Sequence, residues 1–329
     1  MYKKWYVIGN NYQLWDELFN DVGGIVKFPF DEKTTGFFKR LFWRICNSRR
    51  LRYPFYLLWC KIVIKEWNLK KNCTILFLNP SIVLIRSKMY EYLRKKYKAR
   101  INLLMLDSVD CLSQKDARTV IKQQNNFDAI FTFDVHDAKL YGWNLTYKYY
   151  SDISHKVCDV QYKSDVLFIG YNKQRIGTLI DIYDKLTDRG IKCFFAISGV
   201  SEIEKEKFHR EGIVYNKYFS YKEIISMVLG ANVLLEILQD KQIGHSLRMM
   251  ETLVYGKKII TTGAYLEEFP YMDSNRMKYI ETIDDIDKVD LSFFKEKVEN
   301  KVQYDGQFSP IKLFEEIEYY FNSLKDPFE

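Results

Sequence analysis

The sequence predicts an α/β protein with two doubly wound parallel-sheet domains, and three observations lead to this fold class. The chain has 329 residues, about twice the length of a common domain. Short continuous apolar runs recur along it, which is typical of strands covered on both faces. Helix-like segments separate these runs, and strand–helix alternation is typical of doubly wound sheets.

The apolar runs and the segments between them give the expected elements in order. We expect strands at residues 5–8, 74–78, 102–106 and 129–133, and at 166–169, 192–197, 233–236 and 258–261. We expect helices at 82–97, 176–189, 221–229, 246–255 and 310–324. A polar, irregular stretch at 147–165 separates the halves, so the predicted domains are residues 1–155 and 156–308, followed by a terminal helical segment at 309–329.

Composition and charge exclude several classes of protein. Hydrophobic residues make up 47% of the chain, which is enough for two cores and excludes a disordered chain. The net charge of +7 is modest and no nucleic-acid-binding module is recognisable, so nucleic acid is not an expected partner. The most apolar stretch, 53–64, contains Lys61 and is too short for a transmembrane helix, which needs about 20 residues. No segment resembling a signal peptide opens the chain, so we expect a cytoplasmic protein.

One stretch of the chain is strongly basic. Residues 33–65 contain nine Lys and Arg and no Asp or Glu. Within it, Phe38, Leu41, Phe42 and Ile45 fall at helical spacing among cationic side chains. Such a helix is typical of segments that lie on anionic membranes. The alternative is a helix packed on the first domain with a solvated basic face. Residues 36–65 are therefore a candidate contact with the inner face of the plasma membrane.

Two motifs in the second half have the chemistry of a diphosphate site, and the first lies at 165–175. A strand leads to Gly170, and Lys173 and Arg175 follow just before a helix. Backbone amides at a helix start and two cations suit a diphosphate, although an ordinary strand–helix turn with solvated charges has the same pattern. The later glycines of a dinucleotide fingerprint are absent, which disfavours a dehydrogenase.

The stronger motif lies at 244–262. Gly244 permits close backbone approach, and Ser246 caps a helix whose positive dipole end faces the ligand. Arg248 adds a charge suited to phosphate. Glu251 lies in the first turns of the same helix, where a carboxylate accepts two hydrogen bonds from a ribose diol. The alternative is a capped helix whose Glu only complements the helix dipole.

The pattern GxSLRxxExLxxGKKxITT at 244–262 resembles the donor site of GT-B glycosyltransferases, and more narrowly that of bacterial enzymes that build lipopolysaccharide or capsule. The segment 127–142 is similar to the last strand and helix of the first domain in that group. The resemblance covers residues 70–265. It implies two Rossmann-like domains that face a cleft, an acceptor site in the first, a donor site in the second, and a terminal helix at 309–329 that crosses back to the first.

The resemblance implies a role for each matching residue. Glu251 would bind the donor ribose, and Tyr218 would belong to an aromatic or apolar wall against the nucleobase. His245 lies in the donor loop and is a further candidate base or a hydrogen-bond partner of phosphate or sugar, although a lone histidine is more often structural. The residues expected around the diphosphate are Gly170, Lys173, Arg175, Gly244, Ser246, Leu247 and Arg248. No cofactor is implied beyond the nucleotide sugar itself, which is the donor substrate.

One position departs from the family pattern. Many retaining members have a second Glu eight residues before the ribose Glu, and this chain has Ile243 there, so an inverting reaction with one general base is expected. The candidates lie at the carboxyl ends of first-domain strands, where open α/β sheets bind ligands: Asp107, Asp110, Asp134 and His136. Asp107 directly follows an apolar run, which suits a carboxylate in a cleft, although a helix cap or turn residue fits the same position. No metal motif is visible, and cations with helix dipoles would stabilise the leaving diphosphate.

These observations predict a glycosyltransferase that transfers a sugar from a nucleoside diphosphate sugar to a saccharide acceptor, linked to a polyprenyl lipid, in bacterial surface polysaccharide synthesis. One alternative is a transferase of glycerol phosphate from a CDP carrier, although no pair of histidines is obvious. Another is a non-catalytic GT-B-like subunit that binds membrane and a true transferase, which the absent Glu at Ile243 keeps open. We expect Arg248→Ala and Glu251→Ala to weaken donor binding without unfolding the chain.

Overall fold

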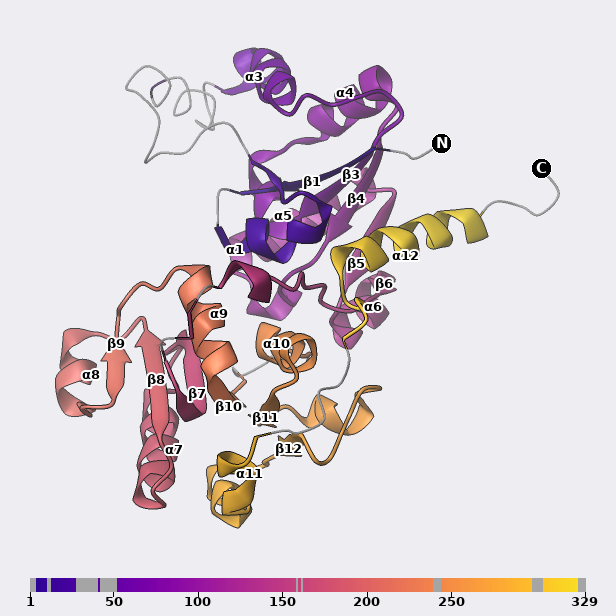
Figure 1. Cartoon of the computed structure of the whole chain (residues 1–329). Coiled ribbons are helices and arrows are strands. Elements are labelled where there is room, and N and C mark those ends of the chain that lie inside the picture. The colour runs from indigo at the N-terminus through magenta and orange to yellow at the C-terminus, as the bar shows by residue number, and fades with distance from the viewer. Residues whose placement is uncertain are drawn as a thin grey trace. The chain divides into compact units, whose positions relative to one another are not determined.

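The structure is a computed structural model that describes residues 4–10, 13–27, 41, 52–157, 159–160, 162–238, 244–297 and 304–324. The chain divides into two compact units. The first unit comprises residues 1–19 and 23–147, and the second comprises residues 20–22 and 148–329. Figure 1 shows a twisted sheet with flanking helices in each unit.

The first unit is built on a six-stranded sheet with the order β2-β1-β3-β4-β5-β6, in which every neighbouring pair is parallel. Its strands are β1 (Trp5–Gly9), β2 (Val26–Lys27), β3 (Thr74–Leu78), β4 (Arg100–Leu104), β5 (Ala129–Thr132) and β6 (Asn144–Leu145). Its α-helices are α1 (Gln13–Leu18), α3 (Arg52–Glu66), α4 (Ser87–Tyr97), α5 (Gln114–Gln123) and α6 (Val135–Tyr141). Short 3₁₀ turns are η2 (Asn79–Leu84), η3 (Val109–Cys111) and η4 (Gln124–Asn126).

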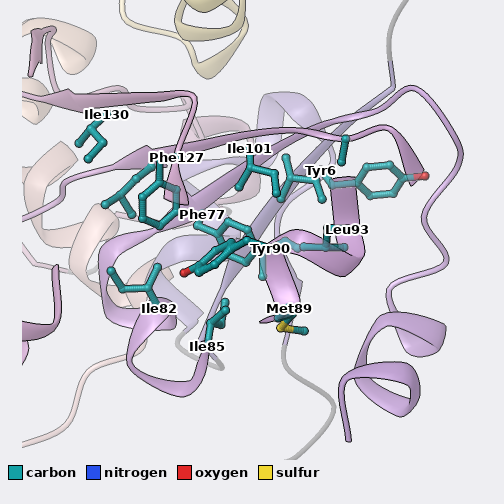
Figure 2. Close-up of a cluster of buried hydrophobic side chains, with 14 of the residues drawn as sticks. Tyr6, Phe77, Ile82, Ile85, Met89, Tyr90, Leu93, Ile101, Phe127 and Ile130 are labelled. Atoms are coloured by element: carbon teal, nitrogen blue, oxygen red, sulfur yellow. The ribbon is translucent and has the colours of Figure 1, made fainter. Parts of the chain in front are cut away.

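The core of the first unit is rich in aromatic side chains. Figure 2 shows Phe77 of β3, Tyr90 of α4 and Phe127, which precedes β5, gathered between sheet and helix. Their rings meet edge to face, with centroids 5.7 Å apart for Phe77 and Tyr90 and 5.1 Å apart for Tyr90 and Phe127. The Tyr90 hydroxyl donates to Oε1 of Gln123 at 2.9 Å, so its polar end is satisfied at the edge of the core.

The second unit repeats the architecture with the strand order β12-β11-β10-β7-β8-β9, again entirely parallel. Its strands are β7 (Ser164–Tyr171), β8 (Cys193–Ser198), β9 (Ile213–Tyr215), β10 (Ala231–Glu236), β11 (Lys258–Thr261) and β12 (Met277–Tyr279). Its α-helices are α7 (Ile176–Asp188), α8 (Glu202–Lys207), α9 (Tyr221–Gly230), α10 (Leu247–Tyr255), α11 (Leu291–Lys295) and α12 (Pro310–Ser323). Its 3₁₀ turns are η1 (Asn20–Val22), η5 (Ser154–Lys156), η6 (Ala264–Glu268) and η7 (Ile283–Lys288).

Both faces of the second sheet are covered. Val166 and Phe168 of β7 belong to the apolar cluster that includes the buried face of α7, whereas Leu167 between them belongs to the cluster that includes α9. Successive strand residues point to opposite faces, so β7 is buried on both sides. This explains why its sequence is continuously apolar rather than alternating. The predicted doubly wound parallel sheets are therefore confirmed in both halves.

The element bounds differ from the predicted ones in two instructive places. The helix predicted at 82–97 is interrupted, because Ile85 and Arg86 have extended backbone between η2 and α4. The strand predicted at 102–106 is β4, which begins and ends two residues earlier. The sequence reading also missed the short edge strands β2, β6, β9 and β12, which have two or three residues each and too little pattern to detect.

The terminal helix α12 packs against η1, a three-residue segment of the first half that clusters with the second unit. Ser309, the N-cap of α12, donates its hydroxyl to Oδ2 of Asp21 at 2.5 Å. Asp21 in turn donates its backbone N–H to Oγ of Ser151 at 3.0 Å. The crossing of residues 309–329 to the first domain stays a prediction, as do the predicted boundaries at 155 and 308.

The basic aromatic helix predicted at 36–46 lies outside the described residues except for Leu41. The later part of the same basic stretch forms α3, which the sequence reading had treated only as an apolar run. None of the helices that the structure describes combines the length and the hydropathy needed to cross a bilayer.

Candidate functional site

The carboxyl ends of the parallel strands in the second unit meet at one edge of its sheet, and α10 begins at this edge. The start of α10 lies beside the end of β10, because the backbone N–H of Ser246 donates to the carboxylate of Glu236. Ser246 is the N-cap, and its Oγ accepts a hydrogen bond from the backbone N–H of Arg248 at 3.0 Å. A capped helix start at the carboxyl edge of an open α/β sheet is a favourable position for an anionic ligand.

A buried carboxylate that the sequence reading missed organises this edge. Glu236 ends β10 and is 3% exposed. It accepts hydrogen bonds from the backbone N–H of Ser246 at 3.1 Å, from the Thr261 hydroxyl at 2.5 Å and from the Tyr265 hydroxyl at 2.5 Å. Burial, and then the charge of Glu236, raise the pKa of Tyr265, so its phenol stays a donor. One side chain thus joins β10, β11, η6 and the start of α10. The only sequence signal was a carboxylate at the end of an apolar run.

Glu251, the expected ribose ligand, lies inside the unit. Its side chain is 0% exposed and forms an ion pair with Arg248 one turn earlier on α10. The Tyr150 hydroxyl lies 3.4 Å from Oε1 of Glu251 and also hydrogen bonds the Tyr221 hydroxyl. Burial raises the pKa of Glu251 to about 6, and Arg248 and the two tyrosines partly oppose that rise.

This arrangement gives Glu251 a structural role at the start of α10. Its carboxylate holds the guanidinium of Arg248, which is 15% exposed and lies in the first turn of α10. A ribose diol reaches the carboxylate only if Tyr150 or Arg248 moves aside. The full burial of Glu251 also changes one expectation from the sequence. Glu251→Ala would leave a buried void and remove the counter-ion of Arg248, so it is not a substitution that leaves folding untouched.

The two cations expected in the first loop of the second unit, Arg175 and Lys173, have different surroundings. Arg175 donates to the carbonyl oxygens of Ile237 and Tyr171, and its guanidinium lies 5.6 Å from the ring centroid of Phe168. Burial lowers the pKa of Arg175. The guanidinium thus joins the carboxyl ends of β7 and β10. Lys173 is exposed and has a φ of 41°, in the left-handed region.

Gly170 lies within β7, one residue before the strand ends, rather than in the turn itself. An added Cβ there would lie 3.1 Å from the Phe168 ring and 3.4 Å from the Arg175 guanidinium, so the glycine leaves room for that stacked pair. Gly244 is buried in the segment that leads to α10, and Leu247 is the first residue of that helix.

Tyr218 and His245 differ sharply in exposure. Tyr218 is 76% exposed in the loop between β9 and α9, at the same edge as the start of α10. His245 is 6% exposed, and its Nε2 accepts the backbone N–H of Lys148 at 3.2 Å. Burial, and then the charge of Lys148, lower the pKa of His245 to about 3. The imidazole is therefore neutral at neutral pH, and the lone pair of Nε2 that a general base would use is engaged.

The first-domain candidates lie at the carboxyl edge of their own sheet. Asp134 is buried and caps α6, with Oδ1 accepting from the backbone N–H of His136 at 2.8 Å and Oδ2 from the Ser108 hydroxyl at 2.5 Å. Asp137 accepts the backbone N–H of Val109 at 2.9 Å, and burial raises the pKa of Asp137 to about 6. Asp107, beside these anchored residues, is exposed, and so are His136 and Asp110.

The geometry sorts the candidate bases by accessibility. Asp107 projects from the loop after β4, and Asp134 and Asp137 hold the two residues that follow it. Asp134 is committed to a helix cap. No group of three or more His, Cys, Asp or Glu side chains suited to a metal occurs within the parts of the chain that the structure describes.

Comparison with solved structures identifies the architecture of the chain. No protein-family model and no curated protein matches the chain. Among solved structures, a putative UDP-N-acetylglucosamine 2-epimerase from Listeria monocytogenes matches with a TM-score of 0.55 and 9% identity, over 98% of each chain. The UDP-GlcNAc 2-epimerase of Methanocaldococcus jannaschii, in complex with UDP-GlcNAc and UDP, matches with a TM-score of 0.50 and 10% identity, over 96% of this chain and 99% of that one.

A UDP-forming α,α-trehalose-phosphate synthase from Burkholderia xenovorans matches with a TM-score of 0.50 and 10% identity, over 87% of this chain and 90% of the other. At such low identity the likeness shows the fold alone. The chain has the GT-B architecture of two Rossmann-like α/β domains, which confirms the predicted fold class.

Proposed function

We propose that this protein is a glycosyltransferase that uses a nucleoside diphosphate sugar. Its second unit binds the donor, and its first unit provides the general base for a saccharide acceptor. The acceptor is linked to a polyprenyl lipid, and the product belongs to a bacterial surface polysaccharide such as lipopolysaccharide or capsule. The reaction inverts the anomeric centre and needs no metal.

The observation that carries this proposal is the start of α10. Ser246 caps the helix beside the carboxyl end of β10, and Glu236 holds the cap through the backbone N–H. Helix amides that are fixed before the ligand arrives stabilise a leaving diphosphate without reorganisation. Arg248 adds a cation that Glu251 orients, and the exposed Lys173 adds a second at the same edge.

The remaining donor contacts follow from exposure. Tyr218 offers an exposed aromatic face beside this edge, suited to a nucleobase. Glu251 binds the ribose once the donor displaces Tyr150. In the first unit, Asp107 accepts the proton of the acceptor hydroxyl, because it is an exposed carboxylate directly before Ser108 and Val109, the residues that Asp134 and Asp137 anchor.

The test is a thermal-shift screen of the full chain against UDP, GDP, CDP, dTDP and CMP. One nucleoside diphosphate should raise the melting temperature selectively, because a ligand that binds only the folded state stabilises it. Arg248→Ala should weaken that nucleotide at least about tenfold, since a charge-assisted hydrogen bond contributes roughly 1.5–3 kcal/mol. Lys207→Ala, an exposed cation at the end of α8 and therefore at the amino-end edge of the sheet, is the matched control and should bind as wild type.

Three results would contradict the proposal: one from the screen, one from a transfer assay and one from the Arg248→Ala variant. A chain that binds none of the five nucleotides would instead be a non-catalytic GT-B-like subunit. A chain that binds CDP and transfers glycerol phosphate rather than a sugar would be a phosphotransferase. Nucleotide affinity as high in Arg248→Ala as in wild type would contradict the assignment of the diphosphate site to the start of α10.

A second candidate function is epimerisation of a nucleotide sugar at C2. It is favoured by the end-to-end match to two proteins described as UDP-GlcNAc 2-epimerases. The two functions differ without any acceptor present. An epimerase changes the C2 configuration of UDP-GlcNAc on incubation with protein alone, whereas a transferase leaves the donor sugar unchanged until an acceptor is added. Proton NMR of the incubated donor distinguishes these outcomes.

A further inference from the structure

The charge of this chain is concentrated in one stretch. Residues 33–100 contain 18 Lys and Arg against two acids, whereas the rest of the chain contains 32 basic and 41 acidic residues. The net charge of +7 is therefore the sum of a strongly basic stretch and an acidic remainder. A basic block of this kind indicates an anionic partner for the surface that carries it. Its described portion includes α3, α4 and the turns that lead into β3 and β4.

A groove runs between α3 and α4, which lie side by side in the first unit (Figure 1). It has a volume of 630 Å³, and its lining consists of Lys61, Ile64, Lys65, Asn68, Leu69, Tyr92, Lys96 and Tyr97. Three cations line this groove, and its described lining contains no Asp or Glu. Such a cavity suits a phosphate group with an apolar or aromatic neighbour.

The cation of α4 is held in place by two aromatic rings. Lys96 Nζ lies 5.3 Å from the ring centroid of Tyr92 and 5.2 Å from that of Tyr97, and it donates to the Tyr92 hydroxyl at 2.9 Å. These contacts, and the Tyr92 hydroxyl first among them, raise the pKa of Lys96, so the ammonium stays charged. Tyrosines are enriched where proteins contact the headgroup region of a bilayer, and an ammonium held between two of them suits that region.

The exposed face of α3 continues the same chemistry. Leu58, Lys61 and Lys65 are spaced by three and four residues, so they share one face of the helix. Leu58 is 52% exposed, and both lysines are exposed. The opposite face, with Cys60, is buried in the core. An exposed leucine among lysines is the pattern of a helix that contacts a lipid surface with its apolar side chain and the lipid phosphates with its cations.

We propose that the groove between α3 and α4 binds phosphate headgroups of anionic lipids and makes this end of the first unit a membrane-docking surface. The inference rests on the proposed function, because a lipid-linked acceptor gives the protein a reason to dock. The occupant is a bilayer rather than a soluble anion, since the exposed leucine and the flanking tyrosines gain contacts only at a lipid surface.

The location of the groove separates docking from catalysis. The carboxyl-terminal halves of α3 and α4 and the loop after α3 line it, just before β3 and β4 begin, so it lies at the amino-end edge of the sheet. Asp107 and Asp134 lie at the carboxyl-end edge of the same sheet. Substitutions in the groove should therefore change membrane binding and leave donor binding unchanged.

The experiment measures co-sedimentation of the full chain with vesicles. Wild type should bind vesicles of phosphatidylglycerol and phosphatidylcholine, bind pure phosphatidylcholine vesicles poorly, and lose binding as salt rises. The triple variant Lys61→Gln, Lys65→Gln and Lys96→Gln should lose roughly 100-fold in partitioning, since each lysine near an anionic surface contributes roughly fivefold. Its melting temperature is measured alongside, and Leu58→Ser, which leaves all charges in place, serves as a second variant that should also weaken binding.

The matched control is Lys115→Gln, Lys122→Gln and Lys139→Gln, three exposed lysines on α5 and α6 of the same unit. It carries the same loss of charge and should bind vesicles as wild type. An equal loss in control and groove variants would overturn the site, because net charge alone would then explain binding. Tighter binding to single-stranded RNA than to vesicles would overturn the lipid assignment. Binding of inorganic phosphate alone that is as tight as the binding of anionic vesicles would overturn it as well.

Nucleotide thermal shifts on the same preparations separate the two proposals. Vesicle binding without any nucleotide shift would contradict the proposed transferase and leave the docking surface standing. A nucleotide shift without binding to anionic vesicles would contradict the docking surface and leave the donor site standing.

Discussion

The carboxylate of Glu236 accepts the backbone N–H of Ser246 at 3.1 Å, so the last residue of β10 fixes the cap of α10. The same carboxylate accepts two hydroxyl donors, from Thr261 and Tyr265. A helix start that depends on one buried side chain is precise only while that side chain is satisfied. Glu236 is thus a positioning residue for the proposed diphosphate site, although it need not touch the donor.

Glu236→Ala should destabilise the chain and weaken nucleotide binding together. The substitution leaves three donors, that of Thr261 buried and those of Ser246 and Tyr265 partly buried, without their acceptor, which costs up to about 1–3 kcal/mol for each group that finds no other partner. Urea denaturation measures the stability, and nucleotide titration of the still-folded protein measures the binding. Glu206→Ala, on the exposed face of α8, is the control and should change neither quantity. Unchanged nucleotide affinity in folded Glu236→Ala would show that the cap does not need this carboxylate.

Glu251 should make the protein less stable as pH rises from acid to neutral. Burial raises the pKa of Glu251 from 4.5 to about 6, so the folded state binds its proton more tightly than the unfolded state does. Between these pH values the unfolding free energy falls as pH rises, by about 2 kcal/mol for a shift of this size. In Glu251→Gln this dependence should vanish. Relative to wild type, the variant should gain about 2 kcal/mol between pH 4.5 and pH 7 in urea denaturation.

The comparison uses the difference between the two proteins at each pH, so that groups common to both cancel. Glu206→Gln should give a difference that does not vary with pH. If the stability difference between wild type and Glu251→Gln is also independent of pH, the Glu251 carboxyl is solvated. A ribose could then reach it without movement of Tyr150.

His245 should act in the opposite direction. Its pKa is lowered from 6.5 to about 3 by burial and by Lys148, so the folded state excludes a proton that the unfolded state binds. The stability from this group is fully present above pH 6.5 and is lost as pH falls toward 3, with about 2 kcal/mol gone by pH 5. His245→Gln retains an acceptor for the Lys148 N–H and removes the titration. Its stability should therefore fall less than that of wild type between pH 7 and pH 5, and an identical fall in both proteins would contradict a buried neutral imidazole.

The sequence reading succeeded where a long pattern repeats and failed where a single contact decides. Continuous apolar runs such as 74–78 and 258–261 identified strands with their observed bounds, because burial on both faces dictates the composition of a central strand. Edge strands of two or three residues, such as β2 and β6, carry no such pattern.

The site followed the same division. The capped start of α10 was legible because Ser246 precedes a helical pattern. The burial of Glu251 could not be predicted in this way. It depends on Tyr150, which is about 100 residues away in the sequence and is brought to Glu251 only by tertiary packing. The side chain of Arg175 donates to the carbonyl oxygens of Ile237 and Tyr171, contacts that no local pattern encodes, and its role as a phosphate ligand stays a prediction.

The carboxylates of the first unit give the last prediction, because exposure separates a chemical role from a structural one. Asp134→Ala should cost about 1–2 kcal/mol of stability, since it removes the cap of α6 and the partner of Ser108. Asp107 is exposed, so Asp107→Asn should change stability by less than about 0.5 kcal/mol. If Asp107 is the general base, the same substitution should lower the rate of sugar transfer roughly 10²–10⁴-fold with donor affinity unchanged. Asp110→Asn, also exposed on the same segment, is the control and should retain turnover. Full activity in Asp107→Asn, with loss in Asp110→Asn or in His136→Gln, would transfer the role of base to that neighbour.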